Sequence, residues 1–223
     1  MMPFKQQKPT ICLITSGQTT VRTAAASKDF SRVLQLAEAA VAAKVDLLQL
    51  REKNLNAHVL YDLARQVVEL VRASATRLVV NDRADIARAA GADGVHLTTA
   101  SLEASVIRRA FGDQFLIGVS THSLEDARGA HQHGADFVVL GPVFETASKR
   151  VYGEPLGLEE LKQVAIELVP FPVLALGGVT LANVASCFRA GATGIAAIRL
   201  LNDPANLARV VQEIRSKFEE QEK

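Results

Sequence analysis

The stretch at residues 49–53, which reads Gln-Leu-Arg-Glu-Lys, is the first in the sequence whose residue types and spacing suit chemistry on an anion. It closes a predicted strand over Asp46–Leu50, and alternation along a strand places Gln49, Arg51 and Lys53 on one face. Two cations and an amide on one face are costly to bring together unless an anion binds between them. We therefore favour an anion site over two solvated charges at a strand end, since guanidinium and ammonium groups bind phosphate well.

A second stretch with anion-binding residue types spans residues 137–149. An apolar run is followed by Gly-Pro and then by Thr146, Ser148 and Lys149, which is the pattern of a buried strand that ends in a polar loop. The hydroxyls, the backbone amides and a cation suit a phosphate ester. Taken alone, the stretch fits an ordinary surface loop equally well.

Glycines and an arginine at two later strand ends are typical of a phosphate site. One predicted strand ends at Gly177-Gly178, and the last predicted strand ends at Ile198-Arg199. Free backbone amides after such strands bind phosphate in many barrels, and Arg199 supplies a charge beside them. The alternative is a tight turn that needs positive φ, and we favour the phosphate site.

Asn81 and Asp82 offer an amide and a hard oxygen ligand at another predicted strand end. Asp82 suits Mg²⁺, although an aspartate before a helix is also a common N-cap, and the two interpretations stay equal. His96 stands in the next predicted strand, where we expect a satisfied core residue rather than a ligand. Ser120 and His122 share a face of the fifth predicted strand. Their spacing and the lack of a third member argue against a nucleophile pair, so we favour hydrogen-bonding or proton-transfer roles.

These residues stand at the ends of strands that alternate with helices along the chain. We expect strands at residues 11–14, 46–50, 78–80, 94–97, 116–119, 137–140, 171–176 and 194–198. Helices are expected at residues 31–43, 57–73, 82–90, 101–111 and 158–168, with further helices that begin after Ser123, Thr180 and Asp203-Pro204. Eight evenly spaced units predict an α/β fold, a single (β/α)₈ TIM barrel in which residues 1–223 form one domain. Active residues of such barrels lie at the carboxyl ends of the strands.

One helix-end pattern occurs three times in the sequence. Gly91, Gly134 and Gly191 each follow a predicted helix, and a predicted strand begins shortly after each of them. Glycine in this place readily adopts the left-handed conformation that ends a helix. Repetition of one helix–glycine–strand unit supports the repeated βα architecture.

Composition and charge exclude several classes of protein. The 223 residues are 48% hydrophobic, enough for one large core, and the formal net charge of +1 argues against a nucleic-acid or membrane-surface protein. Cys12 and Cys187 stand far apart, so we expect neither a disulfide framework nor a zinc site, and a cytoplasmic location fits. We expect neither a signal peptide nor a membrane span, because the start is largely polar and no apolar run approaches roughly 20 residues.

Taken together, the strand ends resemble the thiamine phosphate synthase family, which includes a thiazole tautomerase branch. The motifs that carry the resemblance are Gln49–Lys53, Asn81-Asp82, Ala92–Leu97, Gly118–His122, Gly141–Thr146 with Lys149, and Gly177-Gly178. Each motif is weak alone, whereas their order and spacing together are specific. The resemblance implies a phosphate-binding (β/α)₈ transferase that couples hydroxymethylpyrimidine diphosphate with thiazole phosphate to give thiamine phosphate and diphosphate.

The resemblance also implies roles for individual residues. The pyrimidine diphosphate is expected at Gln49, Arg51, Lys53, Asn81 and Lys149. Asp82 is expected to bind Mg²⁺, and Ser120 to hydrogen-bond the reacting region. The thiazole phosphate is expected at Thr146, Ser148, Gly178, Ile198 and Arg199. A diphosphate leaving group needs its growing charge neutralised, which the cations of this set and Mg²⁺ suit.

The sequence departs from the family pattern where a second acidic Mg²⁺ ligand is usual. Ser101 stands at that position, with Glu103 as a substitute, and Arg199 replaces a common small hydroxyl residue. The missing acid keeps open a thiazole tautomerase, in which His122 shuttles a proton on a thiazole carboxylate phosphate. A non-catalytic paralogue that binds thiazole phosphate is a third alternative. We favour the synthase because the residues for diphosphate are complete, with phosphorylated small molecules as its partners; a homo-oligomer is compatible with the sequence.

Overall fold

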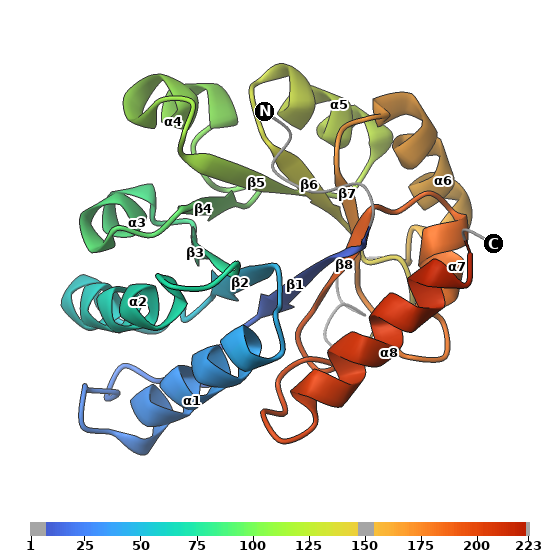
Figure 1. Ribbon diagram of the computed structural model, residues 1–223. Coiled ribbons are helices and arrows are strands. Elements are labelled where there is room, and N and C mark those ends of the chain that lie inside the picture. The colour runs from blue at the N-terminus through green and yellow to red at the C-terminus, as the bar shows by residue number, and fades with distance from the viewer. Residues whose placement is uncertain (1–7, 147–153, 222–223) are drawn as a thin grey trace.

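Eight parallel strands form a closed barrel in the computed structural model, which describes residues 8–146 and 154–221 (Figure 1). Each strand pairs with its neighbours in sequence order, and the eighth strand closes on the first. The strands are β1 (Thr10–Ile14), β2 (Leu47–Leu50), β3 (Arg77–Asn81), β4 (Gly94–Leu97), β5 (Leu116–Thr121), β6 (Phe137–Leu140), β7 (Val173–Leu176) and β8 (Gly194–Ala197). The predicted (β/α)₈ TIM barrel is confirmed.

A helix follows every strand, and the helices form the outer layer around the barrel (Figure 1). They are α1 (Lys28–Ala42), α2 (Ala57–Val71), α3 (Ala84–Ala90), α4 (Ala104–Phe111), α5 (Leu124–Gln132), α6 (Gly157–Leu168), α7 (Val184–Arg189) and α8 (Leu207–Glu219). Across residues 8–146 and 154–221, no helix combines the length and apolar character that a membrane crossing requires.

Apolar side chains fill the barrel from the inside and join it to the helices on the outside. Alternate strand residues point inward, and the interior cluster consists of Cys12, Ile14, Leu47, Val79, Leu116, Phe137, Val139, Leu174 and Ala196. A larger cluster joins the outward strand residues to the helices. The strand register places Gly118 beside Phe137, and a Cβ on Gly118 would lie 2.2 Å from the Phe137 ring. The large ring inside the barrel therefore depends on that glycine.

The repeated helix–glycine–strand unit has a hydrogen-bonding role at the amino end of the barrel. The residue directly before every second strand accepts a backbone N–H from the start of the preceding strand. These bonds join Asp46 to Ile11 (3.0 Å), Asp93 to Leu78 (2.8 Å), Asp136 to Ile117 (2.7 Å) and Thr193 to Val173 (3.0 Å). The three predicted glycines do have positive φ, and Lys44, with φ of 56°, takes the same place in a fourth copy. The repeat thus joins the strands in pairs at the end opposite the expected active site.

Four helices begin later than the sequence predicted. α3 begins at Ala84 rather than at residue 82, and α4 begins at Ala104 rather than at residue 101. α7 and α8 begin later because a turn precedes each of them. α7 begins at Val184 rather than directly after Thr180. α8 likewise begins after a turn in which Asp203 accepts a hydrogen bond from the Ala205 N–H over 3.1 Å. The N-caps predicted at Thr180 and Asp203 are therefore wrong, whereas Ser123 caps α5 as predicted.

Candidate active site

Polar side chains gather at the carboxyl end of the barrel, where the sequence places its candidate ligands. Four neighbouring strands, β2 to β5, each carry one of them near that end: Gln49, Asn81, His96 and Ser120. Alternation along the strands turns all four inward, above the apolar interior. Two further predicted ligands, Ser148 and Lys149, lie outside the described residues.

The four inward side chains form two hydrogen-bonded pairs. Gln49 Nε2 donates to Asn81 Oδ1 over 3.0 Å, and His96 Nε2 lies 2.9 Å from Ser120 Oγ. In each pair the first residue is only 2% exposed and its partner is half-buried. The predicted ligands Asn81 and Ser120 are therefore each hydrogen-bonded to a buried polar side chain, and each is itself only half-buried near the mouth of the barrel.

His96 is a core residue, but it is not the satisfied one that the sequence suggested. Its Nδ1 is buried and has no hydrogen-bond partner within the described part of the chain, and the same holds for Gln49 Oε1. Burial lowers the pKa of His96 to about 4, so the ring is neutral at neutral pH. A buried polar atom without a partner is uncommon in a folded protein and asks for an explanation.

The side chains of Arg51 and Glu52, just after β2, both lie next to Gly17 in the loop after β1. Arg51 is half-buried and its guanidinium lies against Gly17, where a Cβ would be 3.4 Å from Nη1. Glu52 is buried and accepts hydrogen bonds from the Gly17 N–H (3.2 Å) and from the Thr19 hydroxyl (2.6 Å). Glu52 therefore fastens the loop after β1 next to Arg51, a role that the sequence analysis missed, while Lys53 is exposed.

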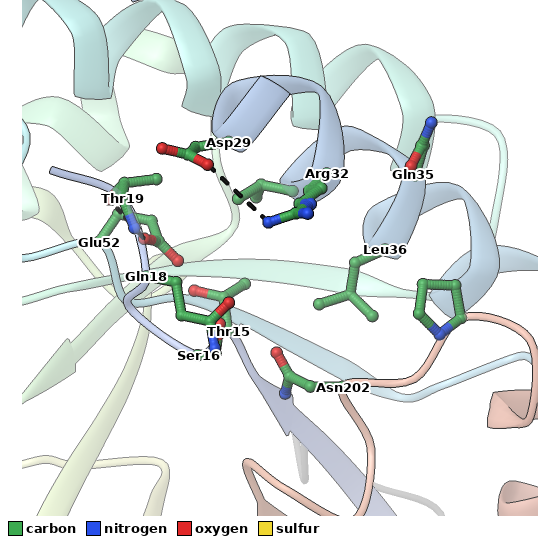
Figure 2. Close-up of a pocket in the computed structure, with 12 residues that line it drawn as sticks. Thr15, Ser16, Gln18, Thr19, Asp29, Arg32, Gln35, Leu36, Glu52 and Asn202 are labelled. Carbon is green, nitrogen blue, oxygen red and sulfur yellow. Dashed lines mark hydrogen bonds and ion pairs between the residues drawn. The ribbon is translucent and has the colours of Figure 1, made fainter. Parts of the chain in front are cut away.

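A pocket of about 370 Å³ lies beside this loop, between α1 and the segment that follows β8 (Figure 2). Gln18, Thr19 and Glu52 contribute to its wall from one side, and Asn202 from another. Among the described residues, its lining includes none of the predicted ligands. The pocket thus lies next to the loop that Glu52 holds, and Gly17 of the same loop contacts Arg51.

Asp82 has a side-chain partner that the sequence analysis did not anticipate. Ser101 Oγ donates to Asp82 Oδ1 over 2.5 Å, and the Thr98 N–H donates to Ser101 Oγ over 2.8 Å. The residue has positive φ of 63° and is exposed, and α3 starts only at Ala84 with no side-chain cap. The N-cap alternative for Asp82 is therefore wrong.

The donor set around Asp82 suits Mg²⁺ in part. Carboxylate and hydroxyl oxygens are hard ligands, and Mg²⁺ commonly takes one or two carboxylates together with substrate phosphates. Within residues 8–146 and 154–221 there is no cluster of three His, Cys, Asp or Glu side chains that suits a metal ion. Glu103, the suggested substitute ligand, instead accepts a hydrogen bond from Ser105 Oγ (3.3 Å). The residues fit a Mg²⁺ site that a phosphate ligand completes.

His122 is separate from the His96–Ser120 pair. Its Nδ1 lies 2.5 Å from the carbonyl oxygen of Gly141, which can only accept, so Nδ1 carries the proton. In the neutral form of the ring, Nε2 is then the proton acceptor. Because Ser120 pairs with His96 rather than with His122, the two residues do not form a nucleophile–base pair, in agreement with the sequence prediction.

The candidate phosphate residues of the later strands also come together. Arg199 Nη2 donates to Thr146 Oγ1 over 2.9 Å, which joins the segment after β8 to the loop after β6. Gly178 has φ of 64°, and a Cβ there would lie 2.7 Å from the Glu145 carbonyl oxygen. The close approach of the two loops therefore requires this glycine. Ile198 packs on the interior cluster just below.

Comparison with known proteins is consistent with this geometry. The sequence model of the family described as "Thiamine monophosphate synthase" matches residues 20–201. The thiamine-phosphate synthase of Roseiflexus castenholzii is 40% identical over 166 residues, which cover 74% of this chain and 72% of that protein. The thiamine-phosphate synthase of Chlorobium phaeobacteroides is 34% identical over 210 residues, which cover 93% of this chain and 96% of that protein.

A solved structure agrees along nearly the whole chain. Thiamine phosphate pyrophosphorylase from Pyrococcus furiosus superposes with a TM-score of 0.78 at 28% sequence identity, and the match covers 96% of this chain and 98% of that one. 3-Hexulose-6-phosphate synthase superposes with a TM-score of 0.66 at 19% identity, a likeness of fold alone.

Proposed function

The chain belongs to the thiamine monophosphate synthase family, and we propose that it couples hydroxymethylpyrimidine diphosphate with thiazole phosphate to give thiamine phosphate and diphosphate. The observation that carries the proposal is the division of one barrel mouth into two anion-binding halves. Arg51 and Asn81 lie at the ends of β2 and β3, whereas Arg199 and Thr146 join the segments after β8 and β6. Two phosphorylated substrates can therefore bind at one mouth without sharing a site.

The half of the mouth around β2 and β3 suits the pyrimidine diphosphate. Arg51 brings a half-buried guanidinium, whose charge is screened less than on an open surface. Asn81 is oriented by Gln49, which leaves its amide N–H groups free to donate to a ligand. Lys53 is exposed and can reach the diphosphate from the solvent side. These groups stabilise negative charge as it grows on the leaving diphosphate.

The coupling exchanges one bond for another at the pyrimidine methylene carbon. The bond from this carbon to the diphosphate oxygen breaks, and the oxygen keeps the electron pair. The thiazole nitrogen then forms the new bond to the carbon, so that thiamine phosphate and diphosphate account for all atoms of the two substrates. The reaction needs no protein nucleophile, which fits the pairing of Ser120 with His96.

Mg²⁺ is part of this proposal, with Asp82 as its carboxylate ligand and the Ser101 hydroxyl beside it. A bound Mg²⁺ supplies positive charge that neutralises the leaving diphosphate. The chain itself orients the Asp82 carboxylate through Ser101 and fixes Ser101 through the Thr98 N–H.

The assay that tests the proposal combines the full chain with both substrates and Mg²⁺ and follows thiamine phosphate by mass spectrometry. We expect coupling by the wild type and at least a hundredfold loss with Arg51→Ala, because the diphosphate loses a countercharge. Arg51→Lys is the matched variant, which keeps the charge and loses the planar fork. Normal turnover by Arg51→Ala would overturn the assignment, and binding of thiazole phosphate without turnover would identify a non-catalytic paralogue.

A thiazole tautomerase is the second candidate, favoured by one observation. The Gly141 carbonyl fixes the proton of His122 on Nδ1 and leaves Nε2 as a base of the kind that proton transfer on a thiazole carboxylate phosphate needs. The test follows isomerisation of that substrate in the wild type and in His122→Gln. An unchanged rate in the variant would remove this role from His122.

The cellular setting belongs to the same proposal. Cys12 and Cys187 are free and buried, as expected for a reducing cytoplasm. The partners are the two phosphorylated small molecules, recognised by the cations and hydroxyls of the mouth.

A further inference from the structure

His96 occupies a place where an apolar side chain would suit the fold better. It is 2% exposed, its ring centre lies 5.9 Å from that of Phe137, and its Nδ1 has no partner in the described part of the chain. Leaving a buried polar atom unsatisfied costs stability. A benefit of the histidine is therefore to be sought in its hydrogen bond to Ser120 Oγ, at 2.9 Å.

The orphan nitrogen indicates which tautomer the ring adopts. A buried N–H without an acceptor is rarer than an acceptor without a donor. Nδ1 is therefore the bare nitrogen, and Nε2 carries the proton and donates to Ser120 Oγ. The Ser120 hydroxyl then keeps its own proton free to donate. Because Ser120 is half-buried at the mouth end of β5, that proton is available to an acceptor on the open side.

We propose that His96 is a positioning residue of the coupling reaction, which holds Ser120 Oγ through Nε2–H and turns the Ser120 hydroxyl proton toward a bound substrate oxygen. His96, which is 2% exposed, acts through Ser120 in this proposal. This inference rests on the proposed function and adds to it a buried residue that was not among the predicted ligands.

A double-mutant cycle tests the proposal. His96→Met replaces the ring by an apolar side chain of similar volume, and Ser120→Ala removes the hydroxyl. We expect each single variant to lower kcat/KM for the pyrimidine diphosphate about tenfold, the effect of losing one hydrogen bond to a charged ligand. The double variant should be no worse than Ser120→Ala, since His96 has nothing left to position. Effects that multiply in the double variant, or full activity of His96→Met, would overturn the proposal.

Two further measurements distinguish a positioning role of His96 from a role in stabilising the fold. His96→Gln retains an amide N–H donor and should recover part of the activity that His96→Met loses. The melting temperature of His96→Met should not fall below that of the wild type, because the variant removes an unsatisfied nitrogen. If His96→Met loses both stability and activity, His96 has a structural role and the proposal is wrong.

Nitrogen-15 NMR of the wild-type histidines tests the arrangement without any variant and without turnover. We expect the His96 ring to carry its proton on Nε2 with Nδ1 bare at neutral pH; a proton on Nδ1 would overturn the proposal. The wild-type coupling assay keeps the two failures apart. A wild type that makes no thiamine phosphate refutes the proposed function, whereas an active wild type with the wrong tautomer or with multiplying effects refutes only the role of His96.

Discussion

Ser101 Oγ donates a 2.5 Å hydrogen bond to Asp82 Oδ1, so a neutral hydroxyl stands beside the proposed Mg²⁺ ligand. The Thr98 N–H fixes this hydroxyl from the other side. With one carboxylate in place, the site offers Mg²⁺ a single negative charge from these side chains, and the phosphate oxygens of a substrate must supply the rest. Metal binding is therefore expected to depend on the diphosphate.

We predict that Asp82→Asn weakens Mn²⁺ binding about tenfold when it is measured by electron paramagnetic resonance with inorganic diphosphate present. The reason is the loss of the carboxylate charge at an otherwise unchanged position. The matched variant Ser101→Asp adds a second carboxylate and should tighten Mn²⁺ binding, most clearly without diphosphate. Equal Mn²⁺ affinity in the wild type and in Asp82→Asn would contradict this view of the site.

The contact between Arg199 and Thr146 yields a prediction about one substrate alone. Arg199→Ser should raise KM for thiazole phosphate about tenfold, because the guanidinium orders the Thr146 loop and adds a charge to the phosphate site. KM for the pyrimidine diphosphate should stay within about twofold of the wild type, since its groups lie at β2 and β3. Steady-state kinetics with each substrate varied in turn measures both effects, and a rise confined to the pyrimidine diphosphate would contradict the division of the mouth.

Much of this site follows from strand alternation and could be read from the sequence. Alternation along β2 predicts one shared face for Gln49 and Arg51, which are buried and half-buried, and the (β/α)₈ count brings both halves of the mouth to one end of the barrel. The Asp82–Ser101 contact could not be read in this way, because it joins two loops whose paths depend on tertiary packing. The sequence also could not show that His96 Nδ1 lacks a hydrogen-bond partner, because its possible partners come from other strands.

Glu52 gives a prediction about the loop after β1. Glu52→Ala should destabilise the protein by about 2 kcal/mol, because the Gly17 and Thr19 donors lose a buried acceptor. Since Gly17 lies against Arg51, the variant should also raise KM for the pyrimidine diphosphate. Urea denaturation and steady-state kinetics measure the two effects. Glu52→Gln keeps one acceptor oxygen and should fall between the wild type and Glu52→Ala in both; unchanged stability of Glu52→Ala would show that the loop does not depend on this carboxylate.

The repeated glycines give a matched pair of fold variants. Gly91 and Gly191 both have positive φ, of 78° and 91°. A Cβ at Gly91 would meet only Val68, 4.0 Å away, whereas a Cβ at Gly191 would lie 2.9 Å from Ala165 Cβ. We expect Gly91→Ala to cost about 1 kcal/mol from backbone strain alone and Gly191→Ala to cost about 2–3 kcal/mol, since it also pushes α6 away. Urea denaturation measures the loss of stability in each variant. Equal losses would mean that α6 can move away from a Cβ at Gly191 without an energetic cost.

Because the Cys12 thiol is buried, we predict that the folded protein loses stability in alkaline solution. The thiol lies inside the barrel, and burial, with a smaller effect of Asp46, raises its pKa to about 12. In the unfolded chain a thiol titrates near pH 8.5. The folded state therefore holds the proton more tightly, so this stability is fully present below about pH 8.5 and is lost as the pH rises toward 12. By pH 10 the loss amounts to about 2 kcal/mol.

The measurement compares urea denaturation at pH 8 and at pH 10 in the wild type and in Cys12→Ala. Lysines and tyrosines titrate in both proteins, so their effect cancels when the two pH-dependent losses are subtracted. Because the alanine has no proton to lose, the variant should lose about 2 kcal/mol less than the wild type between the two pH values, whatever its stability at pH 8. Equal losses in the two proteins would mean that the unfolded chain gains nothing from ionising this thiol, and would contradict the deep burial that raises its pKa.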